Sequence, residues 1–241
     1  MTTAAAVTVS METTDMAAEL ANVTAATMYV YPAALSNFAA TMACAFVVLG
    51  CLGNGTTIVA LLASEKLRSH ATTMFVISLA VTDFIYCVFN MPLTASRYIH
   101  MAWVHSDELC MIFPFLFYGN VAVSILNLLT ITINRYVLIC HTKTYQRIYR
   151  QPYIAFMIVA SWLVPVVFLV PPLFGVWGRY GEKPQTSSCT ILEDENGNSP
   201  KSAIFAVGIG VPMIVIVLCY LRIYWQMQAD QVAARSIIIH L

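Results

Sequence analysis

One carboxylate stands alone inside a long apolar stretch of this 241-residue chain. Asp83 is the only charged residue between Ala71 and Ser96. A carboxylate at the centre of a bilayer costs roughly 2.5–3.5 kcal/mol on insertion scales, so it needs polar partners. With such partners it could hold a cation, a proton or water, or it could only join neighbouring helices through hydrogen bonds.

A second apolar stretch offers those partners. Five of its polar side chains recur at spacings of four, three, three and four residues, which places them on one face of a helix. They are Asn120, Ser124, Asn127, Thr130 and Asn134. The spacing alone slightly favours hydrogen bonding between helices over an ion or water site.

An arginine follows at the end of the same polar face. Arg135 comes after Asn134 and before Tyr136. Its long side chain could extend to the lipid headgroups, or it could act as a switch that is released to bind a partner protein. The residues alone leave both interpretations open.

No catalytic arrangement accompanies these residues. The five histidines are scattered, and the chain has no H-E-x-x-H, G-x-S-x-G or phosphate-binding loop motif. We therefore expect that the protein is not an enzyme.

The composition indicates which solvent surrounds these groups. Apolar residues make up 59% of the chain and charged residues only 10%, whereas soluble domains carry about 25% charged residues. The mean hydropathy is +0.75. So few charges cannot cover a surface in water, and lipid must replace water around much of the chain. The formal net charge of zero predicts no attraction to nucleic acid.

The segments that carry the polar groups are long enough to be membrane helices. A spanning helix needs about 20 mostly apolar residues. Five segments meet this requirement, namely 36–63, 71–96, 107–141, 151–175 and 202–228. We therefore predict an all-α fold, a membrane helix bundle that occupies residues 36–228.

The two ends of the chain are predicted to lie outside this bundle. Residues 1–35 have no pattern of a cleavable signal peptide and are expected to form a disordered extracellular tail. Asn22 lies there in an Asn-Val-Thr glycosylation sequon. Residues 229–241 are predicted to form a cytoplasmic tail.

Basic residues predict the orientation of the bundle. With the N-terminus outside, eight Lys and Arg residues lie on the inner side and four on the outer side, in agreement with the preference of basic residues for the cytoplasm. The outer four are Arg97, Arg179, Lys183 and Lys201.

This orientation also sorts the seven cysteines. Only Cys110 and Cys189 fall at the oxidising outer face. A disulfide there is favoured over two free thiols. It would tie the start of the third span to the loop before the fifth span.

Prolines inside three spans predict kinks, because each proline leaves a backbone carbonyl without its helical donor. They are Pro92, Pro165 and Pro212. Kinked helices are compatible with a binding cavity, although ordinary membrane helices also contain proline.

Taken together and in order, the motifs resemble rhodopsin-like (class A) G-protein-coupled receptors. Each motif falls on the expected span, and the resemblance covers about residues 36–228, five of the family's seven helices. The motifs are Gly53-Asn54, Leu79-Ala80-Val81-Thr82-Asp83, Cys110 with Asn134-Arg135-Tyr136, Trp162, and Pro212 with Tyr220. The segments 64–75, 117–124 and 188–192 further resemble an insect branch of receptors from barrier-forming glia, which is also similar to melatonin receptors.

The resemblance implies a role for each matching residue. It implies a partial sodium pocket that could hold a sodium ion, with no other cofactor, a switch that meets a heterotrimeric G protein, an outer disulfide, and aromatic contacts to an extracellular ligand. The sodium-pocket residues are Asp83, Asn120 and Ser124. The switch residues are Asn134, Arg135, Tyr136 and Tyr220. The disulfide joins Cys110 and Cys189, and the ligand contacts are Phe113 and Phe117.

Two residues depart from the family pattern. Asn134 replaces the usual acid before the arginine, so one ionic restraint on the inactive state is absent and raised basal activity is expected. Phe117, seven residues after Cys110, replaces the acid of amine receptors. We therefore expect a ligand that is not a cationic amine, and favour a neutral or lipid-like one.

The family's sixth and seventh helices have no counterpart in these 241 residues. Three functions follow as hypotheses. The first is a plasma-membrane receptor, or a fragment of one, that signals to a G protein. The second is a truncated, non-signalling isoform that pairs with the full-length receptor and retains it inside the cell. A transporter or channel is disfavoured, because the spans contain one acid and no internal repeat.

Overall fold

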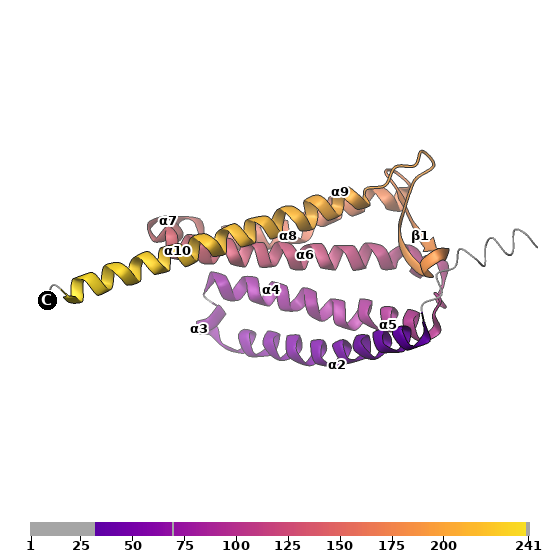
Figure 1. Cartoon of the computed structure of the whole chain (residues 1–241), viewed down its shortest axis with the longest axis horizontal. Coiled ribbons are helices and arrows are strands. Elements are labelled where there is room, and N and C mark those ends of the chain that lie inside the picture. The colour runs from indigo at the N-terminus through magenta and orange to yellow at the C-terminus, as the bar shows by residue number, and fades with distance from the viewer. Residues whose placement is uncertain (1–31, 69, 240–241) are drawn as a thin grey trace, which may run out of the picture.

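The computed structural model describes residues 32–68 and 70–239. Figure 1 shows these residues as a bundle of long helices with a small hairpin at one end. Five described segments are long and apolar enough to cross a membrane. They are α2 (Ala33–Ala63), α4 (Ala71–Ile85) with η1 (Tyr86–Asn90) and α5 (Met91–His100), α6 (Asp107–Cys140), α8 (Gln151–Leu169) with η2 (Pro171–Phe174), and α9 (Lys201–Phe205) with η4 (Ala206–Gly210) and α10 (Val211–Ile239).

Short elements join these helices. Helix α3 (Glu65–Arg68) and helix α7 (Thr142–Ile148) lie at one end of the bundle. Strands β1 (Arg179–Lys183) and β2 (Ser188–Leu192) lie at the other end, joined by η3 (Pro184–Thr186). We refer to these ends as the α7 end and the hairpin end.

The last helix is longer than the sequence analysis predicts. The expected boundary at 228, with a tail over 229–241, falls inside α10, which continues to Ile239. Residues 229–239 contain no glycine or proline and include three alanines, so nothing in their backbone preference stops the helix. The other predicted spans agree with the helices to within a few residues at each end.

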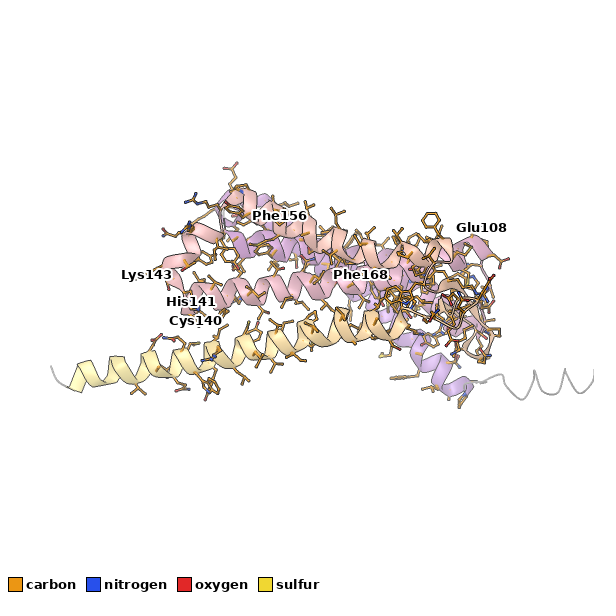
Figure 2. All side chains as sticks on the ribbon, turned by 90° about the horizontal axis from the view of Figure 1, so that it is seen from above. Glu108, Cys140, His141, Lys143, Phe156 and Phe168 are labelled. Atoms are coloured by element: carbon orange, nitrogen blue, oxygen red, sulfur yellow. A yellow bond between two sulfur atoms is a disulfide. The ribbon has the colours of Figure 1, made fainter. Side chains whose placement is uncertain are left out.

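Helix α6 is the central element of the bundle. It packs against α4, α8 and α10, while α2 packs against α4 and α5. Phe75 of α4 is fully buried with Ala71 and with Ile154 of α8. In contrast, Leu49 on α2 is 66% exposed and Phe156 on α8 is 70% exposed. Figure 2 shows Phe156 on the outer side of its helix. Apolar side chains that face outward in this way suit a bilayer, in which the backbone is satisfied within each helix.

Two of the predicted proline sites follow a widened helical turn. The π-helical segments η1 and η4 each end two residues before a proline, Pro92 and Pro212 respectively. Proline lacks an N–H and crowds the preceding turn, and a π-helical turn is one way to accommodate it. Pro165 lies inside α8, and a further proline that the sequence analysis did not single out, Pro114, lies inside α6.

The hairpin is fixed to the start of α6. Strands β1 and β2 are antiparallel, with Arg179 opposite Leu192 and Glu182 opposite Cys189. A disulfide joins Cys189 to Cys110, with their Cα atoms 5.2 Å apart. The predicted pairing is confirmed. Because Ser106 caps α6 by accepting a hydrogen bond from the Leu109 N–H at 3.3 Å, the disulfide joins the hairpin to a well-defined helix start.

Candidate functional site

Asp83 lies against the polar face of α6. The Ser124 hydroxyl donates a hydrogen bond of 2.8 Å to Asp83 Oδ1, between α6 and α4. Asn120 lies one helical turn from Ser124 and is buried, and its side chain makes no hydrogen bond to the described residues. Two side-chain oxygens therefore meet in the bundle, beside one buried amide.

This set of oxygen ligands fits a monovalent hard cation better than a transition metal. Among residues 32–68 and 70–239, no three His, Cys, Asp or Glu side chains gather as a metal site. Carboxylate and neutral oxygens are the ligands that hard cations prefer. The donor set around Asp83 is thus compatible with a monovalent cation, with one carboxylate to balance one charge.

The middle of the polar face joins α6 to its neighbours. Asn127 is fully buried and accepts a hydrogen bond of 3.5 Å from the Ser161 hydroxyl of α8. Nearby, the Trp162 indole donates a hydrogen bond of 3.0 Å to Ser78 of α4. Thr130 instead bonds to the Leu126 carbonyl of its own helix. In the middle of the bundle, the polar face therefore makes hydrogen bonds between helices, one of the two interpretations that its spacing leaves open.

Asn134 and Arg135 differ in burial at the α7 end. Asn134 is completely buried, accepts a hydrogen bond of 2.7 Å from the Thr72 hydroxyl, and donates one of 3.3 Å to the Tyr145 hydroxyl. It therefore connects α6 to α4 and to α7. Arg135 is exposed. The sequence analysis did not find Thr72 and Tyr145, because their approach depends on how the helices pack.

The aromatic neighbours of this link are also packed. Tyr145 stacks on Tyr149 with ring centroids 4.8 Å apart, and Tyr149 meets Phe75 edge-on at 6.4 Å. Burial, with a smaller contribution from Tyr145, raises the pKa of Tyr149 to about 12. The Tyr149 hydroxyl therefore stays neutral at physiological pH.

The other two predicted switch residues lie apart from this link. The Tyr136 hydroxyl is 3.0 Å from Nε2 of His141. Both residues line a cavity of about 290 Å³ between α6 and α10, together with Arg222. Figure 2 shows His141 with Cys140 and Lys143 at this end of α6, opposite Glu108. Tyr220 on α10 is 49% exposed, and no contact brings it to Arg135.

A second cavity lies at the hairpin end. Its volume is about 350 Å³, and it is lined by α5, α6, the hairpin and the start of α9. Phe113 and Phe117 both line it, and their ring centroids are 5.7 Å apart. Phe113 also packs on the disulfide. The two aromatic residues singled out from the sequence therefore share one cavity.

The polar lining of this cavity was missed by the sequence analysis. It includes three basic side chains, Arg97, Lys183 and Lys201, and the hydroxyl of Thr190. The sequence did contain an indication of this lining. The three cations are among the four basic residues on the predicted outer side of the bundle, where basic residues are disfavoured. Their convergence depends on the hairpin folding back over α5 and α6.

A third cavity is apolar and lies between α6, α8 and η4. Its volume is about 430 Å³. Its lining includes Ala122 and Leu126 from α6, Phe168 from α8, and Val207 from η4. Tyr118 lines both this groove and the cavity at the hairpin end.

Comparison with known proteins identifies the class. Residues 53–237 match the 7 transmembrane receptor (rhodopsin family). The chain therefore belongs to this family, as its motifs predict, and the family consists of receptors rather than enzymes. The crystal structure of squid rhodopsin shares the fold, with a TM-score of 0.71 at 23% identity over 86% of this chain and 57% of that one.

Individual relatives narrow the comparison. The chain is 47% identical to Protein trapped in endoderm-1 of Drosophila melanogaster over 201 residues, which is 83% of this chain and 51% of the relative. It is 40% identical to the G-protein coupled receptor moody of Drosophila pseudoobscura pseudoobscura, over 79% of this chain and 28% of the relative. Melatonin receptor type 1C of Gallus gallus is 34% identical over 74% of this chain and 50% of the relative. The chain thus spans about half or less of the length of these relatives.

Proposed function

We propose that this receptor sequence receives an extracellular signal at the hairpin end and passes it to a heterotrimeric G protein at the α7 end. The observation that carries the proposal is the contrast between Asn134 and Arg135. The buried Asn134 anchors α6 to α4 and α7, while the exposed Arg135 is available to a protein partner. The cavity beside the disulfide lies at the opposite end of the same helix.

The proposed orientation puts the hairpin end outside the plasma membrane and the α7 end in the cytoplasm. Lys143, Arg147 and Arg150 follow α6 at the α7 end, as expected for a cytoplasmic loop. The disulfide at the hairpin end suits an oxidising compartment. The proposed glycosylation site, Asn22, would lie on the same side, although it falls outside the described residues.

The experiment that tests the proposal uses cells that express the receptor containing this sequence. It measures G-protein dissociation as the loss of resonance energy transfer between labelled G-protein subunits. Arg135→Ala should reduce the signal at least about tenfold, since charged hydrogen bonds contribute about 1.5–3 kcal/mol each. Arg150→Ala is the matched control, because it removes an exposed basic residue from the same end of the bundle. Equal signals from Arg135→Ala and the unsubstituted receptor would overturn the proposal.

We also propose that Asp83 holds a sodium ion together with Ser124 and Asn120. The 2.8 Å contact between Ser124 and Asp83 supports this, since it gathers two oxygen donors beside a buried amide. A bound ion stabilises the folded state in proportion to the logarithm of its concentration once the site is saturated. The melting temperature of the chain should therefore be higher in sodium chloride than in choline chloride, and Asp83→Asn should remove the difference. A difference that persists in Asp83→Asn would place the sodium effect elsewhere.

A role in barrier-forming glia is a further proposal, based on the resemblance to the insect branch. Detection of the transcript in that tissue by in situ hybridisation would support it, and its absence there would contradict it.

A further inference from the structure

The cavity at the hairpin end has an unbalanced charge. Arg97, Lys183 and Lys201 line it, whereas no acidic side chain does. Glu182 is next to Lys183 on β1, but it is exposed and does not line the cavity. Among the described residues, none of the three cations has an acidic partner within ion-pairing distance. A cavity with this lining attracts anions.

Two of the cations are held in place by neutral groups. Lys201 Nζ donates a hydrogen bond of 3.2 Å to the Thr190 hydroxyl, which is also 3.0 Å from the Tyr118 hydroxyl. Arg97 donates a bond of 3.4 Å to the Thr186 carbonyl, and its guanidinium lies 4.2 Å from the Tyr98 ring centroid. An arginine has five N–H donors and a lysine three. Most of these donors therefore remain available to a ligand, on side chains that are already ordered.

The rest of the lining mixes hydroxyl-bearing side chains, Thr94, Thr186, Ser188 and Thr190, with aromatic ones. Phe113 and Phe117 form the aromatic part of the cavity. Tyr118 also lines the apolar groove between α6, α8 and η4, so this one residue borders both spaces. The groove has a volume of about 430 Å³ and is lined by segments that could span a membrane. Such a groove suits a hydrocarbon chain rather than a polar group.

We infer that the ligand of this receptor is an anionic amphiphile. Its carboxylate or phosphate head binds Arg97, Lys183 and Lys201, and its apolar chain passes Tyr118 into the groove. The inference rests on the proposed function, because it takes the cavity at the hairpin end to be the ligand site. Of the neutral and lipid-like ligands that the sequence favours, it keeps the lipid-like one and gives it a negative head.

The test is a binding measurement on the 241-residue chain in phosphatidylcholine nanodiscs without a G protein. The probes share an oleoyl chain and differ in the head: 1-oleoyl lysophosphatidic acid, oleic acid and the neutral 1-oleoylglycerol. We expect saturable binding of at least one anionic probe, at least about tenfold tighter than that of the neutral probe. Which anionic probe binds more tightly distinguishes a phosphate from a carboxylate. Equal binding of all three probes would overturn the inference.

Substitutions of the basic side chains test where the anionic head of the ligand binds. Arg97→Gln and Lys201→Gln should each weaken binding of the anionic probe about tenfold. Arg179→Gln is the matched control, because it removes an exposed basic residue from the same hairpin without touching the cavity. Formation of the Cys110–Cys189 disulfide reports that each variant folds. Unchanged affinity in both cavity variants would refute this placement of the head.

A substitution that fills the groove tests where the apolar chain of the ligand lies. Ala122→Phe places a ring in the groove, whereas Ala206→Phe places it on an exposed position of η4 outside the lining. Ala122→Phe should weaken the oleoyl probe and spare hexyl phosphate, whose chain is too short to enter far. Equal weakening of both probes would contradict the groove assignment. If binding holds but G-protein dissociation fails in cells, the proposed function alone is contradicted.

Discussion

At the scale of single residues, the substitution of an amide for the expected acid at position 134 has a visible structural consequence. Asn134 uses both ends of its amide, accepting from Thr72 and donating to Tyr145. A carboxylate could accept from both hydroxyls, and it would add a negative charge next to Arg135. The amide therefore keeps the links between helices but leaves the arginine without an ionic restraint.

Asn134→Asp should accordingly lower ligand-free signalling of the receptor. The new charge would restrain Arg135, while the two hydrogen bonds to neutral hydroxyls remain possible. The measurement is basal nucleotide exchange on purified G protein. Asn134→Ala is the comparison, since it removes both links and should lower stability by about 1–3 kcal/mol. Unchanged basal exchange in Asn134→Asp would contradict the hypothesis of raised basal activity.

Tyr149 gives a prediction for alkaline pH. Burial raises its pKa from 10.0 to about 12, so the folded state disfavours the tyrosinate. Its contribution to stability is complete below the unfolded pKa and is lost as the pH rises from 10 towards 12. Tyr149→Phe should therefore show a smaller loss of melting temperature between pH 9 and about pH 11 than the unsubstituted chain. Identical pH profiles would show that ionisation of Tyr149 does not lower the stability of the folded chain.

At the scale of helices and strands, the sequence predicts most of what later gathers into sites. Asp83 and Ser124 belong to one predicted pocket, and they do form a hydrogen bond. The five spans follow from apolar length alone. The pairing of Cys110 with Cys189 follows from their common side of the membrane. The spans and the disulfide need only the order of residues along the chain and the side at which each helix ends, whereas the pocket follows from the resemblance to the receptor family.

What the sequence does not predict depends on contacts between elements. The approach of Arg97, Lys183 and Lys201 requires a hairpin that folds over α5 and α6, and their positions in the chain give no distance between them. Asn90 is another case, a fully buried amide in η1 with no hydrogen-bond partner among the described residues. The extension of α10 to Ile239 was missed because a tail was inferred where hydrophobicity ends, whereas helix propensity continues.

The disulfide gives a prediction for the hairpin. It closes a loop with a sequence separation of 79, for which chain entropy gives about 4 kcal/mol as an upper bound, because a bilayer already restricts the unfolded chain. The double variant Cys110→Ser and Cys189→Ser should melt several degrees lower than the unsubstituted chain. Cys44→Ser is the control, since Cys44 is a free and exposed thiol. Equal melting of both variants would mean that the packing of the hairpin, and not the disulfide, holds it in place.

At the scale of the whole molecule, each end of the bundle has its own proposed task. Figure 1 shows the hairpin and α7 at opposite ends of the long helices. Helix α6 runs between them and carries Cys110 and Phe113 near one end, Ser124 in the middle, and Asn134 and Arg135 near the other. Under the proposed function, a signal received beside the disulfide reaches the G protein through one continuous helix and its hydrogen bonds to α4, α7 and α8.

The orientation of this helix in the membrane is the central claim, and it can be measured on the chain itself. Glu182→Cys on β1 and Gln146→Cys on α7 both introduce a thiol at an exposed position. A membrane-impermeant maleimide should label Glu182→Cys in intact cells, and should label Gln146→Cys only after permeabilisation. The reverse pattern would place the cationic cavity in the cytoplasm and Arg135 outside, and would contradict the assignments of both ligand and G protein.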